Sequence, residues 1–364
     1  SHSFAIQRYS SLYITMSAAN LEGAIYGMGN PLLDISAVVP QETLDAWGVK
    51  LNNAILAEEK HVPLYAELAK NFPVQYIAGG ATQNTIRVAQ WALQVPNATT
   101  YTGCIGNDAF GSELTKAATA DGVKVLYQVN DSVPTGTCAV LVKDHERSLI
   151  ANLSAANKFS PDHLETPELK EAIEKAKIFY SSGFFLTVSP PSFQHVAAHA
   201  NKADKIVAVN LAAPFIPQFF SEPLLAAIAV SDFVFGNESE AESFAAQQKL
   251  EKNDAETVAK YIAALPTRDG AKPRTAVITQ GAHATVVCVN GVVTRFDVPA
   301  LAKDMIVDVN GAGDAFVGGF LAQLARGKDI ANCVEAGHYC ARTILQVSGT
   351  ALPADKPDAT KVVV

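Results

Sequence analysis

Short apolar runs alternate with longer amphipathic stretches over most of the chain. The short runs are rich in β-branched and aromatic side chains, as strands are, and they predict strands at 25–29, 99–104, 178–181, 206–210, 233–236 and 275–279. The stretches between them predict helices at 82–93, 112–121, 168–176, 191–200, 254–264, 315–324 and 330–345. Because alternating strands and helices form crossover units, we expect an α/β fold with a doubly wound, mostly parallel sheet and helices on both faces.

Two regions depart from this alternation. Strand-like runs at 35–39, 54–57, 74–77, 137–142 and 148–152 lack full crossover helices between them. We interpret them as a smaller α/β lid domain formed by 34–78 and 134–153, packed over a large nucleotide-binding domain of 22–33, 79–133 and 154–364. Asn290-Gly291, between apolar runs at 285–289 and 292–298, predicts a two-residue β-hairpin.

Charge and composition narrow the classes of function. The 364 residues carry a formal net charge of −8, and no cluster of Lys and Arg suggests a nucleic-acid or membrane partner. Apolar runs such as 224–230 are too short to span a bilayer. The five cysteines are odd in number and include no Cys-x-x-Cys pair, which favours reduced thiols in the cytoplasm, with the nucleus as a further location.

Residues 1–21 differ from the rest of the chain in their charged side chains. Residues 1–21 contain no acidic side chain and a single arginine, Arg8, and Met16 is followed by Ser-Ala-Ala-Asn. We expect Met16 to be the natural start and 1–21 to be an extension that is disordered or derived from an expression vector. A transit peptide is the alternative, although such segments are usually richer in arginine.

Residues 308–319 carry the clearest chemical signal. They read Asp-Val-Asn-Gly-Ala-Gly-Asp-Ala-Phe-Val-Gly-Gly and lead into a predicted helix. The backbone around Gly311, Ala312 and Gly313 can approach a ligand closely, and the N–H groups of a helix start attract anions. An acid at that point, Asp314, suits a general base that takes a proton from a hydroxyl beside a held phosphate. The alternative is a glycine-rich turn with Asp314 as a helix cap.

Two further motifs are candidates for holding a sugar. Asp34 follows a strand end, and its carboxylate can accept hydrogen bonds from two neighbouring hydroxyl groups. Gly80 would let a sugar approach the backbone, and the amide of Asn84 can both donate and accept. The alternatives are a turn or cap aspartate for Asp34 and a turn that opens the helix at 82–93.

Other polar residues suggest a phosphate and metal site. Asn237 and Glu240 form an Asn-x-x-Glu motif after a strand. The motif would suit Mg²⁺ held through its water shell. The alternative is that Asn237 simply caps the following helix. Arg147, on the proposed lid, would pair with phosphoryl oxygens on closure, or lie at the surface. His195 and His199 are spaced like a metal pair, but no third ligand accompanies them, so we read them as ordinary histidines.

Two common nucleotide-binding patterns are missing from the sequence. There is no Gly-x-x-x-x-Gly-Lys-[Ser/Thr] motif, which excludes a P-loop kinase. Gly27-Met28-Gly29 lacks the third glycine of a dinucleotide fingerprint, and Pro31 would interrupt its turn.

Six stretches, at 27–39, 78–84, 147–153, 182–190, 235–241 and 308–320, occur in the order found in one family. On these stretches the chain resembles the ribokinase-like (PfkB) carbohydrate kinases, and within them the branch that phosphorylates adenosine. The resemblance covers nearly the whole chain from Ala24 onward. One departure is Val309, where that branch carries threonine, so that a hydroxyl near the phosphates is missing.

The resemblance implies an activity. ATP and Mg²⁺ would serve to phosphorylate the 5′-hydroxyl of adenosine, giving AMP and ADP in purine salvage. Because the sequence shows no clear extra segment that would clasp a second copy, we expect a monomer. The sequence leaves open a ribokinase-like sugar kinase and a non-catalytic nucleoside-binding protein.

The resemblance also implies roles for individual residues. Asp34, Gly80 and Asn84 would hold the ribose, with Asn30, Ala81 and Asn310 as further substrate contacts, and the base would stack on apolar side chains. The apolar contacts would be Leu32, Leu56, Cys138, Leu149, Ala151, Leu153 and Phe185. On the ATP side we expect Asn237, Thr279, Gly281, Ala336 and His338.

Overall fold

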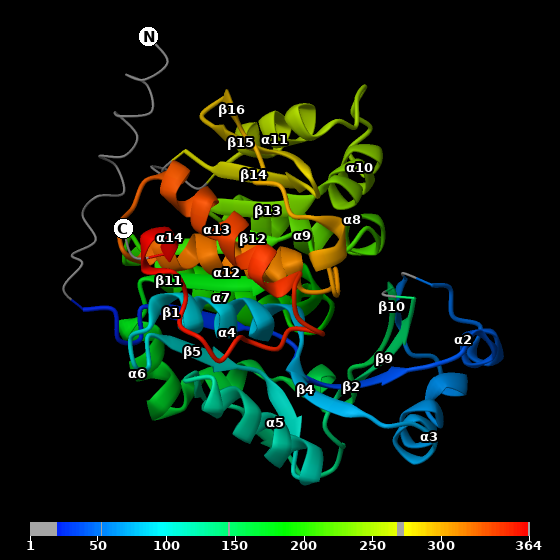
Figure 1. Ribbon diagram of the computed structural model, residues 1–364. Coiled ribbons are helices and arrows are strands. Elements are labelled where there is room, and N and C mark those ends of the chain that lie inside the picture. Colours follow the sequence, from blue (N-terminus) through cyan, green and yellow to red (C-terminus); the bar gives the residue numbers. More distant parts are fainter. Residues whose placement is uncertain (1–19, 52, 145, 268–272, 363–364) are drawn as a thin grey trace.

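The computed structural model describes residues 20–51, 53–144, 146–267 and 273–362, and its centre is a nine-stranded sheet (Figure 1). The expectations for residues 1–19 lie outside these ranges. The strand order is β16-β15-β14-β13-β12-β11-β1-β5-β7. The strands are β1 Ile25–Met28, β5 Thr99–Thr102, β7 Lys124–Val125, β11 Ile178–Ser182, β12 Ile206–Asn210, β13 Phe233–Asn237, β14 Thr275–Gln280, β15 His283–Val289 and β16 Val292–Phe296.

The sheet is parallel from β7 through β14 and antiparallel at its β15–β16 edge, where Asn290 and Gly291 join the two strands. Its middle strands are buried on both faces, which explains why they read as continuous apolar runs rather than alternating ones. Successive residues of one strand enter opposite cores: Phe179 packs into one core, and Tyr180 packs into the other.

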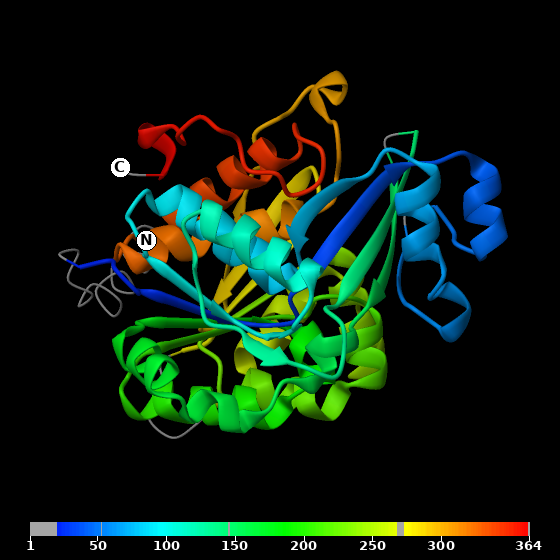
Figure 2. The same ribbon diagram turned by 90° about the horizontal axis from the view of Figure 1, so that it is seen from below.

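Helices cover both faces of this sheet, as the sequence predicts (Figure 2). One face is covered by α4 Ala81–Leu93, α12 Ala312–Ala325 and α13 Ile330–Ile344. The other is covered by α6 Pro167–Lys175, α7 Pro190–Lys202, α8 Phe215–Phe219, α9 Ser221–Ala229, α10 Glu238–Gln247 and α11 Ala255–Ala264. Gly318 and Gly319 of α12 let its neighbours approach closely, since a Cβ on them would lie 2.7 Å from the Thr85 carbonyl oxygen and 2.4 Å from that of Ala336.

A second sheet of five strands stands to one side, at the right of Figure 1. Its order is β3-β10-β9-β2-β4, from β2 Leu32–Val38, β3 Ala54–Leu56, β4 Gln75–Gly79, β9 Thr137–Lys143 and β10 Glu146–Asn152. Helices α2 Gln41–Trp47 and α3 Leu64–Asn71 cover its outer face through Leu44, Leu64 and Leu68. We refer to this sheet and these two helices as the lid, and its domain limits at 34–78 and 134–153 stay a prediction.

Some element boundaries differ from the predictions. The strand expected at 99–104 is divided into β5 and β6 Cys104–Gly106, and β6 pairs with β8 Gln128–Asn130 in a small sheet of its own. Helix α5 Ala109–Ala120 starts earlier than expected, because the Asp108 carboxylate accepts the N–H of Gly111 and caps it. Helix α12 begins at Ala312 rather than at residue 315, directly after Gly311 with φ +75°. Asp314 therefore lies inside the first turn of α12.

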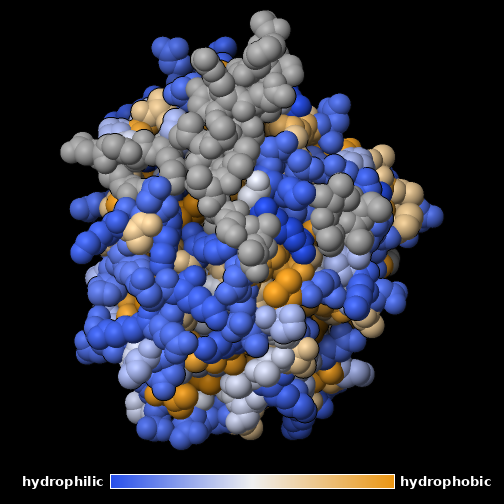
Figure 3. Space-filling view, turned by 90° about the vertical axis from the view of Figure 1, so that its left-hand side faces the viewer, coloured by the Kyte–Doolittle hydropathy of each residue, from blue (hydrophilic) through white to orange (hydrophobic). Residues whose placement is uncertain are grey.

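Figure 3 shows one face as largely hydrophilic, with small and separated hydrophobic areas, because most large apolar side chains lie in the cores. In the described ranges, no helix combines the length and the apolar character needed to cross a bilayer.

Candidate active site

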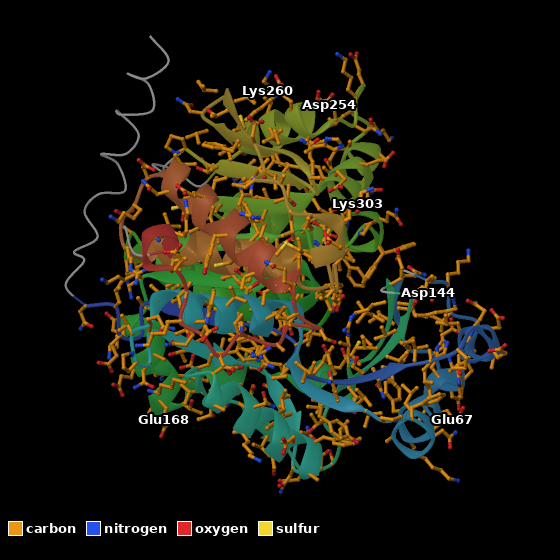
Figure 4. The ribbon with its side chains drawn as sticks, in the orientation of Figure 1. Glu67, Asp144, Glu168, Asp254, Lys260 and Lys303 are labelled. Carbon is orange, nitrogen blue, oxygen red and sulfur yellow. The ribbon has the colours of Figure 1, made fainter. Side chains whose placement is uncertain are left out.

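A cavity of about 340 Å³ lies between the inner face of the lid sheet and the carboxyl ends of the main strands. This is the edge at which parallel α/β sheets bind ligands, and the volume suits a small molecule. Most of the predicted site residues line it: Asn30, Leu32, Asp34, Leu56, Gly80, Ala81, Asn84, Cys138, Leu149, Ala151, Leu153, Asn237, Glu240, Thr279, Asn310, Gly311, Gly313 and Asp314. The charged residues labelled in Figure 4, by contrast, lie at the periphery of the lid and of the main body.

Six predicted residues do not line the cavity. Phe185 is fully buried and packs on Phe159 with ring centroids 5.4 Å apart, whereas its neighbour Phe184 lines the cavity. His338 is buried against Phe316, and its Nε2 lies 2.8 Å from the Thr285 hydroxyl. The remaining four are Ala312, Arg147, Gly281 in the β14–β15 turn and Ala336, which packs on α12.

Several cavity-lining residues are not among the predicted site residues. They are Ile55, Ser182, Phe184, Thr187, Asn210, Ala212, Phe215, Phe235, Gly236, Val277, Phe316 and Val317. Most are apolar and resemble ordinary core residues in sequence. Two signals could have found some of them: the family-like stretches 182–190, 235–241 and 308–320, and the carboxyl ends of β11, β12 and β13, where Ser182, Asn210 and Gly236 lie.

Asp314 is the acid at the N-terminal end of α12. Its Oδ2 accepts a hydrogen bond from Asn84 Nδ2 at 3.0 Å. Burial raises the pKa of Asp314 to about 7, and the Asn84 bond acts in the opposite direction. A half-buried carboxylate whose pKa lies near neutrality matches a general base.

The start of α12 supplies an anion site beside this acid. The N–H groups of Ala312, Gly313 and Asp314 lie in the first helical turn and have no carbonyl partner within the helix. A Cβ built on Gly313 would meet no atom within 4 Å, so its backbone faces open space. The helix dipole adds partial positive charge at this point.

Asp34 enters the cavity from strand β2 of the lid. It is only 8% exposed, and burial raises its pKa to about 7, while the positive charges of Arg87 and Arg147 act against that shift. Gly80 follows at the junction of β4 and α4 with φ +96°, and a Cβ there would lie 2.3 Å from the Asn30 carbonyl oxygen. Only glycine allows the chain to turn here, beside Asp34 and Asn84.

Asn237 and Glu240 form a reciprocal cap at the start of α10. The Asn237 side-chain oxygen accepts the N–H of Glu240, and the Glu240 carboxylate accepts the backbone N–H and the side-chain amide of Asn237 at 3.0 and 2.9 Å. The capping interpretation therefore holds, and the pair also lines the cavity. Burial raises the pKa of Glu240 to about 7, with the nearby Asp314 charge adding to the effect.

The charge of the cavity is acidic. Asp34, Glu240 and Asp314 line it, and no Lys or Arg does so among the described residues. A polyphosphate would therefore depend on the start of α12 and on an added cation. One carboxylate and one amide are too few for an all-protein Mg²⁺ cage, but they fit a metal held mainly by phosphates and water.

Arg147 is held away from the cavity. Its Nε lies 2.5 Å from Asp308 Oδ2, and its guanidinium also donates to the hydroxyl groups of Ser36 and Ser348. Asp308 accepts the backbone N–H groups of Asn310 and Gly349 as well. The lid, the loop before α12 and the 348–350 loop thus meet at one buried ion pair.

Asn30 presents a buried acceptor at the cavity. The side chain of Asn30 donates to the Phe184 carbonyl oxygen at 3.1 Å, while its Oδ1 has no hydrogen-bond partner among the described residues. Buried polar atoms normally have a partner, so a ligand donor is expected here.

Comparisons with known proteins agree with this geometry. Residues 41–357 match the model of the pfkB family carbohydrate kinases. "Adenosine kinase 1" of Arabidopsis thaliana is 52% identical over 343 residues, which cover 94% of this chain and 99% of that protein. An Anopheles gambiae adenosine kinase, solved in complex with P1,P4-di(adenosine-5) tetraphosphate, aligns with a TM-score of 0.87 at 46% identity, covering 90% of this chain and 97% of that chain. A Schistosoma mansoni adenosine kinase in complex with 2-fluoroadenosine aligns with a TM-score of 0.87 at 37% identity, covering 92% and 98%.

Proposed function

The chain belongs to the pfkB family of carbohydrate kinases, and on that premise we propose that it is an adenosine kinase, which transfers the γ-phosphoryl group of ATP to the adenosine 5′-hydroxyl. The observation that carries this proposal is the half-buried Asp314 carboxylate, which shares one cavity with Asp34 and with the open N–H groups of α12. The products are AMP and ADP.

Adenosine would occupy the lid side of the cavity. Asp34 accepts hydrogen bonds from the two ribose hydroxyl groups, and Gly80 lets the sugar approach the backbone. The free Oδ1 of Asn30 takes one further donor from the substrate. The purine stacks on the apolar wall of Leu32, Leu56, Cys138, Leu149, Ala151, Leu153 and Phe184.

Phosphoryl transfer then follows from the position of Asp314. Its carboxylate takes the proton of the 5′-hydroxyl, the oxygen attacks the γ-phosphorus in line, and the bond to the ADP oxygen breaks. The N–H groups at the start of α12 stabilise the negative charge that develops on the transferred group. Closure of the lid excludes water, which would otherwise accept the phosphoryl group.

ATP would lie along the β13–β14 side of the cavity. Thr279 lines that side, while Gly281 lies in the adjoining turn and Ala336 and His338 are packed beneath it. Asn237 and Glu240 would hold Mg²⁺ through its water shell, and the bound metal would neutralise part of the phosphate charge. In the closed enzyme Arg147 would leave Asp308 and approach the phosphates.

We further propose a monomeric protein of the cytoplasm and the nucleus. The outer face of the lid sheet is already covered by α2 and α3, so it presents no open apolar face to a second copy. The cysteines are free and buried thiols, which suits a reducing compartment.

A coupled assay of ADP release tests the function. With ATP and Mg²⁺, adenosine should be turned over far faster than ribose, fructose or pyrimidine nucleosides, because the base wall is apolar. Faster turnover of ribose or fructose would make the protein a sugar kinase. Adenosine binding without ADP release would make it a nucleoside-binding protein.

A further inference from the structure

A continuous hydrogen-bond chain leads from Arg87, through Thr350 in the C-terminal part of the molecule, to Asp314. The guanidinium of Arg87 donates to the Thr350 hydroxyl at 3.4 Å, and that hydroxyl donates to Asn84 Oδ1 at 3.1 Å. The Nδ2 of Asn84 then donates to Asp314 Oδ2 at 3.0 Å. Arg87, Asn84 and Thr350 are only 4%, 6% and 2% exposed, so bulk water does not compete for the two bonds of Thr350, whereas the bond to Asp314 lies at the wall of the cavity.

The chemistry of the donors gives this chain a fixed direction. A guanidinium can only donate, so Thr350 accepts from Arg87 and its own hydrogen is available for Asn84. The hydroxyl therefore bonds to the oxygen end of the Asn84 amide, and the nitrogen end faces Asp314. An amide turned the other way would direct an oxygen at the carboxylate and leave Thr350 facing an N–H group.

Arg87 is itself fixed in place. Its Nε lies 2.5 Å from Asp121 Oδ2, and its guanidinium donates to the Ala78 carbonyl oxygen of β4 at 2.7 Å. Thr350 is held by its packing on the loop before α12, since a Cβ on Gly311 would lie 2.2 Å from Thr350 Cγ2. Arg87 and Thr350, the first two members of the hydrogen-bond chain, are thus anchored by contacts that involve neither Asn84 nor Asp314.

From these contacts we propose that Thr350 is a positioning residue for the catalytic base: its hydroxyl fixes the orientation of the Asn84 amide, so that an N–H group always faces Asp314. The inference rests on the proposed function, in which Asp314 must be ionised to act. An N–H donor favours the ionised carboxylate, and an amide oxygen in its place would favour the protonated form.

Other charged and titratable groups face Asp314. Asp34 on β2, Glu240 on α10 and the Tyr180 hydroxyl on β11 interact with it electrostatically. None of these groups is bonded to Thr350, so a substitution at Thr350 leaves them in place while it frees the amide.

The test uses two substitutions that separate the hydroxyl from the shape of the side chain. Thr350→Val keeps the shape and removes the hydroxyl, and Thr350→Ser keeps the hydroxyl and removes the methyl group. The acid limb of the kcat/KM profile for adenosine should move up by about one pH unit in Thr350→Val and stay in place in Thr350→Ser. Thr343→Val is the matched control, because its hydroxyl bonds only to the Tyr339 carbonyl oxygen within α13, and it should leave the profile unchanged.

A second measurement does not require activity. NMR titration of protein labelled at the aspartate carboxyl carbons, with Asp314→Asn to assign the signal, gives the pKa of Asp314 directly. We expect it to rise by about one unit in Thr350→Val alone. If Thr350→Val does not fold, Thr350→Ala removes the same hydroxyl together with the methyl group, and Thr350→Ser then shows the effect of losing the methyl group alone.

The outcomes separate the two hypotheses. An unchanged pKa of Asp314 in Thr350→Val overturns the role of the hydroxyl, and so does an equal rise in Thr350→Val and Thr350→Ser. In either case, adenosine turnover by the unsubstituted protein would still support the kinase. A rise confined to Thr350→Val in a protein that does not phosphorylate adenosine would support the hydrogen-bond chain and reject the kinase.

Discussion

The Nε of Arg147 lies 2.5 Å from Asp308 Oδ2, and this ion pair joins lid strand β10 to the loop before α12. Both side chains are almost fully buried, and Ser36, Ser348 and Gly349 complete their hydrogen bonds. The guanidinium of Arg147, which we expect to approach the phosphates, is therefore paired with Asp308 where the lid contacts the main body. Arg147 links the position of the lid to the anion site at α12.

Removing the arginine should destabilise the fold. Arg147→Met leaves the Asp308 carboxylate buried without its cation, which destabilises proteins by about 3–5 kcal/mol. Urea unfolding measures this change. Arg295→Met is the control, because its pair with Glu256 is exposed and its loss should have little effect. Equal stability changes in the two variants would contradict a structural role for the buried pair.

Asp314→Asn tests the proposed base. We expect kcat to fall by about 10²–10⁴-fold, because the variant cannot accept the 5′-hydroxyl proton. Adenosine affinity should be largely kept, since the amide is nearly the same size. Steady-state kinetics and calorimetry measure both, with Glu168→Gln on the outer helix α6 as a control (Figure 4). A near-normal kcat would remove Asp314 from the mechanism.

The pH dependence of kcat/KM should reveal the same group. Burial raises the pKa of Asp314 to about 7 in the free protein, and only the ionised form can accept a proton. The value of kcat/KM should therefore rise about tenfold per pH unit below pH 7 and level off above it. An acid limb near pH 4 would show that Asp314 is not the base or that its burial does not persist in solution.

Asp34→Ala tests the ribose contact. The variant loses hydrogen bonds to the two ribose hydroxyl groups, so adenosine binding should weaken by about 1–3 kcal/mol. Isothermal calorimetry measures the Kd. Asp45→Ala, on the exposed helix α2 of the lid, should leave it unchanged. An unaltered Kd in Asp34→Ala would place the ribose elsewhere.

Glu240 should make the free protein less stable as the pH rises. Burial raises its pKa from 4.5 to about 7, so the native state binds more protons than the unfolded state between these values. Its contribution is fully present below pH 4.5 and is lost towards pH 7, at a slope of up to about 1.4 kcal/mol per pH unit. Denaturant unfolding gives the free energy of unfolding of the unsubstituted protein and of Glu240→Gln from pH 4.5 to 7, and the two pH dependences should differ by this slope. If the free energies of the two proteins change with pH in parallel, Glu240 makes no such contribution.

The sequence predicts the sheet well because each central strand is buried on both faces, which leaves a long apolar run such as 206–210 and a strand with the same limits. It does not predict α2 and α3, because each is short and lies between lid strands. The buried face of α2 consists of Leu44, and that of α3 consists of Leu64, Tyr65 and Leu68. The amphipathic pattern there is too brief to distinguish from a loop.

The sequence predicts the site residues that belong to a local motif. It misses those that only long-range contacts bring to the site. Asp34, Asn84 and Asp314 belong to recognisable motifs and meet in one cavity. Phe184 and Phe185 cannot be told apart in sequence, because the turn of η4 Gly183–Thr187 decides which ring faces the cavity. Thr350 contacts Asn84, which lies 266 positions earlier in the chain, and no local sequence pattern predicts such a contact.

The loop at 348–350 also has a consequence for the order of synthesis. Thr350 follows every strand of both sheets along the chain, yet it lies between Arg87 and Asn84 near the beginning. A ribosome can release all strands for pairing before this loop leaves its exit tunnel. The nascent protein would then pair its strands before Thr350 reaches Arg87 and Asn84, so the amide that faces Asp314 would be oriented only at a late stage of synthesis.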